Sequence, residues 1–164
     1  MACTCNLGNI DRNCARNAPG LKTVLRLACV DDITSIGAAT NHVVSTITPV
    51  TDKGFYSINV IRKDNNLEST PGEDGGFTTE GKFFISKQEA AKHNVLTKLS
   101  SDENYIAITE DQNDLKEIVG STTHPAIVRV KAVKSPKNGY ELTLLWEGHA
   151  DLPLTFSGTI PTPA

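Results

Sequence analysis

Four cysteines lie within the first 29 residues, and a cluster of cysteines is a common sign of a metal site or of disulfide bonds. Cys3 and Cys5 are separated by one residue, whereas paired zinc ligands usually have two to four residues between them. Cys14 and Cys29 stand apart, and the nearest histidine is His42. We therefore expect reduced thiols, with Cys29 packed as a small apolar side chain in a strand.

The histidines do not form a catalytic group in the sequence. They are widely spaced, at His42, His93, His124 and His149, and such a dispersed set is typical of surface side chains. The chain has no nucleophile elbow, no phosphate-binding loop and no H-E-x-x-H motif. A calcium loop that began at Asp111 would need glycine and glutamate where Lys116 and Thr122 stand. The sequence predicts no enzyme, metal site or cofactor.

Two short segments concentrate charge of opposite sign. Residues 101–117 hold six acids and one base, whereas residues 129–137 hold four bases and no acid. The net charge of −3 disfavours nucleic-acid binding through a basic surface. The two segments are typical of solvated hairpin faces, and the alternative is complementary surfaces that meet between subunits, where charge fixes the register of contact.

The length of 164 residues is typical of a single domain that buries its own core. Residues 1–20 are rich in asparagine and glycine and follow no period, so we expect an N-terminal arm that a partner can order. Residues 21–164 form the predicted domain. The first residues lack the basic and apolar regions of a secretory signal, and no apolar run is long enough for a membrane helix, so we expect a cytoplasmic origin and no membrane partner.

Period-2 alternation in short runs predicts strands along most of the chain. The Asn-Gly pair at residues 138–139 predicts a hairpin between two of these runs. The predicted strands are residues 22–29, 55–61, 77–85, 105–109, 115–119, 126–133, 140–146 and 154–160.

One helix is expected, over residues 86–99. Ser86 followed by Glu89 has the spacing of a capping box, and Ala91, Val95 and Leu99 recur at helical spacing with Leu96 beside them. The segment 64–76 is read as a long irregular loop, and residues 31–53 have mixed patterning with room for short strands. The fold class is therefore mainly β: an antiparallel β-sandwich or barrel of about seven strands with one flanking α-helix at 86–99.

The order of several weak features along the chain resembles the tail tube proteins of tailed bacteriophages, closest to those of phages that infect Bacteroidetes. The features span nearly the whole chain. They are a Met-Ala-Cys-Thr arm, Pro-Gly-Leu-Lys-Thr-Val at 19–24, Ile-Thr-Ser-Ile at 33–36, Phe-Tyr at 55–56, Phe-Phe-Ile at 83–85, the helix, the 105–120 hairpin and Phe-Ser-Gly at 156–158. The chain departs from the family at 111–114, where Asp-Gln-Asn-Asp replaces a turn that contains glycine.

The resemblance implies a virion structural protein that forms hexameric rings, which stack into the tail tube through which DNA leaves the capsid. It implies self-association, contacts with other tail proteins, DNA as non-specific cargo, and assembly in the host cytoplasm. A heterologous interface closes such a ring, and we expect it to pair sheet edges. The arm and residues 63–77 are expected to contact the next ring, with Asn65, Asn66, Leu67, Glu68 and Pro71 as candidates.

A lumen of negative potential would let DNA slide, because binding needs lysine or arginine to neutralise phosphates. The candidates for an acidic lumen are Asp102, Glu103, Glu110, Asp111 and Asp114. The main alternative is a capsid decoration or head–tail connector protein, which would share the small β-sandwich and would form a closed trimer or a ring that never stacks. A tube of a contractile injection system and a small enzyme or ligand-binding β-barrel are further alternatives.

Overall fold

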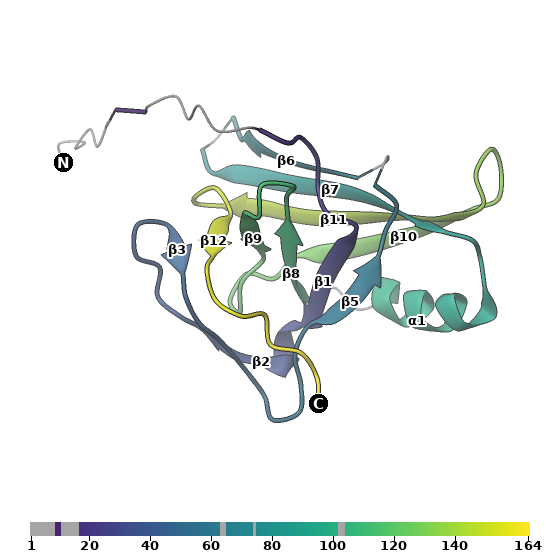
Figure 1. The fold of residues 1–164 in the computed structure, drawn as a ribbon, viewed down its shortest axis with the longest axis horizontal. Helices are drawn as coiled ribbons and strands as arrows, with labels where there is room; N and C mark the ends of the chain where they lie inside the picture. Colours follow the sequence, from purple (N-terminus) through teal and green to yellow (C-terminus); the bar gives the residue numbers. More distant parts are fainter. Residues whose placement is uncertain (1–8, 11–16, 63–64, 74, 102–103) are drawn as a thin grey trace.

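The fold is a layered β-sandwich with one helix at its side (Figure 1). The computed structural model describes residues 9–10, 17–62, 65–73, 75–101 and 104–164. The first half contains β1 (Val24–Cys29), a short 3-10 turn (Val30–Asp32), β2 (Ile33–Ile36), β3 (Val43–Val44), β4 (Ile47–Pro49), β5 (Tyr56–Asn59) and β6 (Asn66–Pro71). The second half contains β7 (Phe77–Ser86), α1 (Ala90–Ser101), β8 (Tyr105–Glu110), β9 (Lys116–Val119), β10 (Ile127–Val133), β11 (Gly139–His149) and β12 (Leu154–Phe156).

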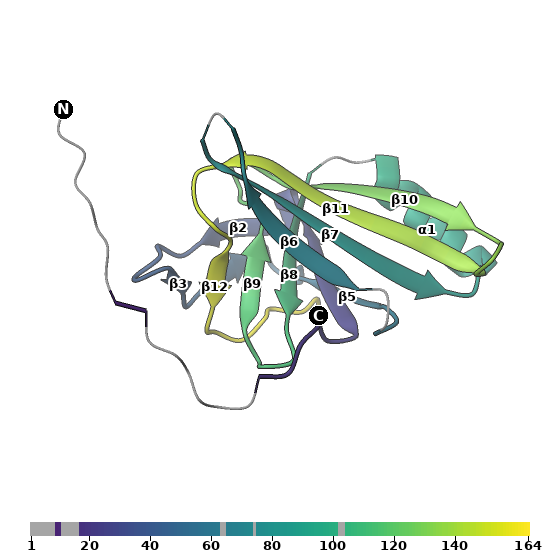
Figure 2. The same ribbon diagram turned by 90° about the horizontal axis from the view of Figure 1, so that it is seen from above.

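The strands form three sheets. A six-stranded sheet has the order β3-β12-β9-β8-β1-β5, a four-stranded sheet has the order β10-β11-β7-β6, and β2 pairs with β4. Seen from above, the long strands of the four-stranded sheet cross over the six-stranded sheet (Figure 2). All pairs are antiparallel except β12 with β3. The predicted mainly-β sandwich is confirmed, and the described sheets do not close into a barrel.

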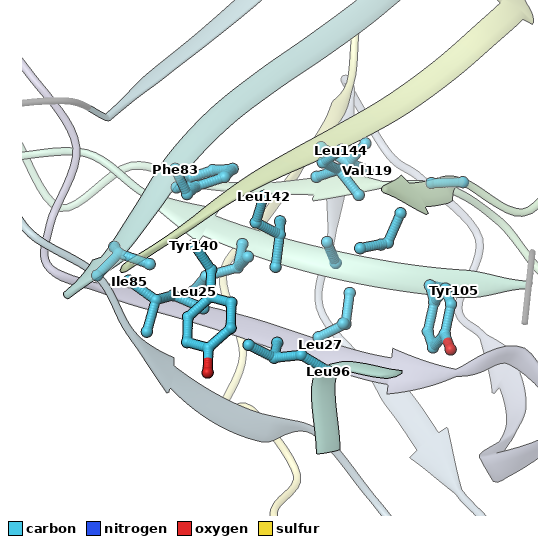
Figure 3. Close-up of a cluster of buried hydrophobic side chains, with 14 of the residues drawn as sticks. Leu25, Leu27, Phe83, Ile85, Leu96, Tyr105, Val119, Tyr140, Leu142 and Leu144 are labelled. Carbon is cyan, nitrogen blue, oxygen red and sulfur yellow. The ribbon is translucent and has the colours of Figure 1, made fainter. Parts of the chain in front are cut away.

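Two apolar cores lie on opposite faces of the six-stranded sheet. Strand β8 contributes to both, because Ala107 faces the core under the four-stranded sheet and Ile106 faces the core under β2 and β4. The first core is the larger, and Leu142 and Leu144 of β11 lie in it between the sheets (Figure 3). Cys29 packs against this core, as expected for a small apolar side chain.

The helix begins later than its sequence pattern predicts. Ser86 is the last residue of β7, where it pairs with Gly139, so it cannot cap a helix. The first helical hydrogen bond runs from the His93 amide to the Glu89 carbonyl. The helix therefore occupies Ala90–Ser101, because Ser86, which the capping box would need, is paired with β11 as part of β7.

The predicted long loop at 64–76 is wrong over residues 66–71, and residues 64 and 74 lie outside the described residues. Asn66–Pro71 form β6, which pairs with β7 in register from Asn66 with Lys82 to Pro71 with Phe77. The polar composition of this segment concealed a strand, because an edge strand with one solvated face needs few apolar residues. Its proline is accommodated because the position lies at the strand end on an edge.

Candidate functional site

The predicted ring contacts gather on one edge of the four-stranded sheet. Asn66, Leu67, Glu68 and Pro71 belong to β6, and Asn65 directly precedes it. No second strand of the described chain pairs with β6 on its outer side. The buried side-chain amide of Asn65 has no hydrogen-bond partner among the described residues, which is costly for a polar group unless another molecule supplies one.

A cavity of about 630 Å³ brings β6 next to the turn between β8 and β9. Its lining includes predicted ring-contact residues of β6 and also Asp111, which is one of the predicted lumen acids. The residues that line it are Gly20, Leu21, His42, Asn65, Asn66, Leu67, Glu68, Ser69, Asp111, Glu117, Leu152, Pro153 and Thr155.

Among the titratable groups that line this cavity, Glu117 has a shifted pKa. Burial raises the pKa of the Glu117 carboxyl, and the nearby negative charge of Asp111 raises it further. The positive field of His42 acts in the opposite direction. The pKa of Glu117 is therefore higher in the folded protein than in an unfolded chain, and removing its charge favours the fold.

Two of the predicted lumen acids, Glu110 and Asp114, form ion pairs within the subunit. Lys22 Nζ lies 2.7 Å from Glu110 Oε1 and also donates to Asp114 Oδ1. These two carboxylates raise the pKa of Lys22, and Lys22 in turn lowers the pKa of Asp114. Asp102 and Glu103 lie outside the described residues.

The same turn holds the start of the predicted domain. The amide of Gln112 donates to the carbonyl of Gly20, its side chain donates to Leu21, and Asn113 Oδ1 accepts from the amide of Ala18. Residues 17–22 therefore lie along the β8–β9 turn. The acids at 110–114 are largely engaged in fixing this segment.

His149 is buried, although the sequence pattern predicts a surface histidine, whereas His93 is exposed as expected. His149 is 5% exposed and stacks on Trp146 with ring centroids 3.8 Å apart. Its Nδ1 donates to the carbonyl of Asp151, so in the neutral ring Nε2 accepts from the Thr79 hydroxyl at 2.9 Å. His93, expected on the polar side of the helix, bonds to the Tyr140 hydroxyl.

No group of three or more histidine, cysteine, aspartate or glutamate side chains among the described residues could hold a metal ion. His149 has a backbone carbonyl, and no carboxylate, on its second nitrogen, which differs from a catalytic triad. None of the described helices has the length and apolar character needed to cross a membrane.

Sequence reasoning missed Lys22 at the β8–β9 turn, Ser69 in the cavity beside β6, and Arg26 in a separate cavity that Lys22 also lines. Lys22 and Arg26 read as the polar face of a strand, and Ser69 lay in the supposed loop. The available signal was the alternation of Leu67, Ser69 and Pro71 with polar residues, which is weak because only Leu67 is strongly apolar. Comparisons with protein-family models, with curated proteins and with solved structures find no match to this chain.

Proposed function

We propose that this protein is a virion structural subunit whose hexameric rings stack into the tail tube of a tailed phage. The observation that carries the proposal is a four-stranded antiparallel sheet whose outer strands, β6 and β10, have no strand partner in the described chain. The resemblance in the order of motifs along the chain supports the same function.

The direction of the strands suits ring closure. Each neighbouring pair in the order β10-β11-β7-β6 is antiparallel, so β6 and β10 run in opposite directions. The β6 edge of one copy can therefore pair with the β10 edge of the next and continue the antiparallel pattern. Such a contact joins two different patches, as a heterologous ring interface requires, and it removes both exposed edges.

The location of β6 changes the role proposed for its residues. An edge strand is suited to contacts between neighbours within one ring, whereas a projecting loop would reach the next ring. We therefore assign Asn65, Asn66, Leu67, Glu68 and Pro71 to the contact within the ring. The unpartnered amide of Asn65 would obtain its hydrogen bonds there.

The outer face of this sheet would line the tube. Its charges are mixed in sign, with Lys82 3.9 Å from Glu80 and Lys131 3.8 Å from Glu141. Lysines that already face carboxylates neutralise DNA phosphates poorly, so DNA can pass without being held. This arrangement takes Glu110, Asp111 and Asp114 off the lumen wall, because they belong to the six-stranded sheet and its turn.

Negative-stain electron microscopy with light scattering on the purified protein tests the function. Hollow tubes or stacked rings are expected, and a closed trimer or a ring that never stacks would contradict the proposal.

Two variants test the β6 edge. The Gly72 amide donates a hydrogen bond to the Gly76 carbonyl across the β6–β7 pair. Because the amides of an antiparallel strand point alternately toward and away from the paired strand, the Ser69 amide points away from β7.

Ser69→Pro removes that amide, whereas Ser69→Ala removes only the hydroxyl that bonds to Thr79. Both variants therefore lose the same side-chain bond, and only the proline variant blocks pairing at the edge. We expect Ser69→Ala to form tubes and Ser69→Pro to remain folded but unassembled. Normal tubes from Ser69→Pro would show that β6 is not the ring contact.

A further inference from the structure

Strand β5 is the outer strand of the six-stranded sheet beside α1 (Figure 1). The Val60 amide bonds inward to the Thr23 carbonyl, and Ile58 pairs with Leu25 in the same register. Because antiparallel bonding alternates along a strand, the backbone N–H and C=O groups of Ser57 and Asn59 face away from β1. No other described strand pairs with them.

This open edge has defined ends. The Phe55 amide also faces away from β1, and it donates to the Pro161 carbonyl at 2.9 Å. At the other end the Ile61 amide donates to the Phe84 carbonyl at 2.9 Å. The protein therefore covers both ends of this strand edge with its own backbone. It leaves a free stretch at Ser57–Asn59, which we call the β5 window. At roughly 3.3 Å per residue, the window spans about 10 Å, which suits a short extended segment better than the full edge of another sheet.

One side of the window opens on an apolar groove of about 460 Å³ between β5 and α1. Ile58 and Ile85 lie on the sheet side, and Leu96 is buried at its base. Val95 is 60% exposed, although its spacing in the sequence predicts a buried position. The helix thus presents apolar side chains to the groove that no described residue covers.

The opposite face of the sheet is basic beside the same window. Arg26 lies next to Ser57 in register, and its guanidinium donates to the Ser57 hydroxyl. Arg26 and Arg62 line a cavity of about 400 Å³ together with Lys22 and Glu110. Lys22 and Glu110 pair with each other, whereas neither arginine forms an ion pair with a described residue.

We propose that the β5 window binds a short extended peptide segment of a partner protein, whose residues alternate between apolar and acidic. The segment adds a strand by bonding to the peptide groups of Ser57 and Asn59. Its apolar side chains enter the α1 groove, and its carboxylates meet Arg26 and Arg62 on the other face. This inference is independent of the proposed tube, which uses the other sheet.

The test uses the full chain and two synthetic capped peptides of equal length, one alternating valine with glutamate and the other alternating valine with lysine. Isothermal titration calorimetry should show tighter binding of the glutamate peptide. Hydrogen exchange should show slowing at the amides of Ser57 and Asn59 on binding. Equal binding of both peptides, or no protection at these amides, would overturn the proposal.

Matched variants separate the groove from general effects of substitution. Val95→Asp places a charge in the groove, and Val50→Asp changes a valine that is 40% exposed elsewhere. We expect Val95→Asp to weaken binding of the glutamate peptide at least about tenfold, which is roughly 1.4 kcal/mol, and Val50→Asp to leave it unchanged. Equal weakening in both variants would contradict a role for the groove.

A second pair tests the backbone contact. Asn59→Pro removes an outward amide, whereas Asn59→Ala keeps it, and circular dichroism verifies that both variants fold. Loss of binding only in Asn59→Pro supports strand addition. If neither peptide binds and Asn59→Pro instead abolishes self-association, the occupant is a second copy of the chain and the proposal is wrong.

Discussion

At the turn between β8 and β9, side-chain hydrogen bonds stabilise a turn that contains a left-handed residue other than glycine. Asp114 has a φ of 66°, a left-handed conformation that aspartate tolerates better than most residues. Asp111 Oδ1 accepts from the amides of Asn113 and Leu115, which closes the turn. Asp114 therefore occupies a left-handed position that glycine adopts more easily than other residues.

The acidity of Glu117 leads to a prediction at the same scale. Its pKa is raised in the folded state, so its charge destabilises the fold above that pKa, and the penalty disappears below the ordinary value of 4.5. Glu117→Gln should therefore be more stable than the parent chain at pH 7, by less than about 1 kcal/mol because the carboxyl is partly exposed. Urea unfolding at pH 7 and at pH 4 measures the difference. An equal difference at both pH values would rule out the charge as its cause.

The helix illustrates how elements compete for residues. Pairing with β11 extends β7 to Ser86, and α1 is instead fixed at its start by Tyr140, which is 2% exposed. The Tyr140 hydroxyl contacts the backbone of Glu89 and the ring of His93. Local helix signals were correct in kind, but the long-range strand pairing moved the boundary.

This anchor can be tested with a pair of tyrosine variants. Tyr140→Phe removes the hydroxyl and should cost about 1–2 kcal/mol of unfolding free energy, because its hydrogen bonds to the backbone of Glu89 and to His93 are lost. Amide exchange should accelerate in α1 more than in the sheets. Tyr56→Phe is the control, because Tyr56 is 54% exposed. Uniform acceleration throughout the chain would contradict a local anchoring role.

Over the whole molecule, the six-stranded sheet is covered on both faces, and the segment after β12 completes the second cover. Ile160 packs against the second core, and the Pro161 carbonyl bonds to the Phe55 amide. This segment therefore serves stability and also limits the free edge of β5. Both effects depend on a contact between residues that are distant in the sequence.

Removing residues 159–164 should reduce stability and lengthen the free edge of β5, and comparison with Ile160→Ala should separate these two effects. We expect a loss of about 2 kcal/mol of unfolding free energy, from the exposed apolar surface and the lost backbone bond. Urea denaturation measures it, and light scattering should show association that rises with concentration as the edge lengthens. Ile160→Ala keeps the Pro161 carbonyl, so it should lose stability without the association. Association in both variants would indicate exposure of the core as the cause.

The sequence alone determined the strand-rich character, because alternation in runs such as 126–133 reflects burial on one face and needs no knowledge of the partner strand. It also predicted a hairpin between β10 and β11 from the Asn-Gly pair, although Gly139 belongs to β11, where it pairs with Val133, and the connection is residues 134–138. Only the tertiary structure decided that Asn66–Pro71 is a strand, that Val95 is exposed and that Lys22 meets Glu110. Each of these depends on which distant segments meet, and a polar edge strand or a surface ion pair carries almost no local pattern.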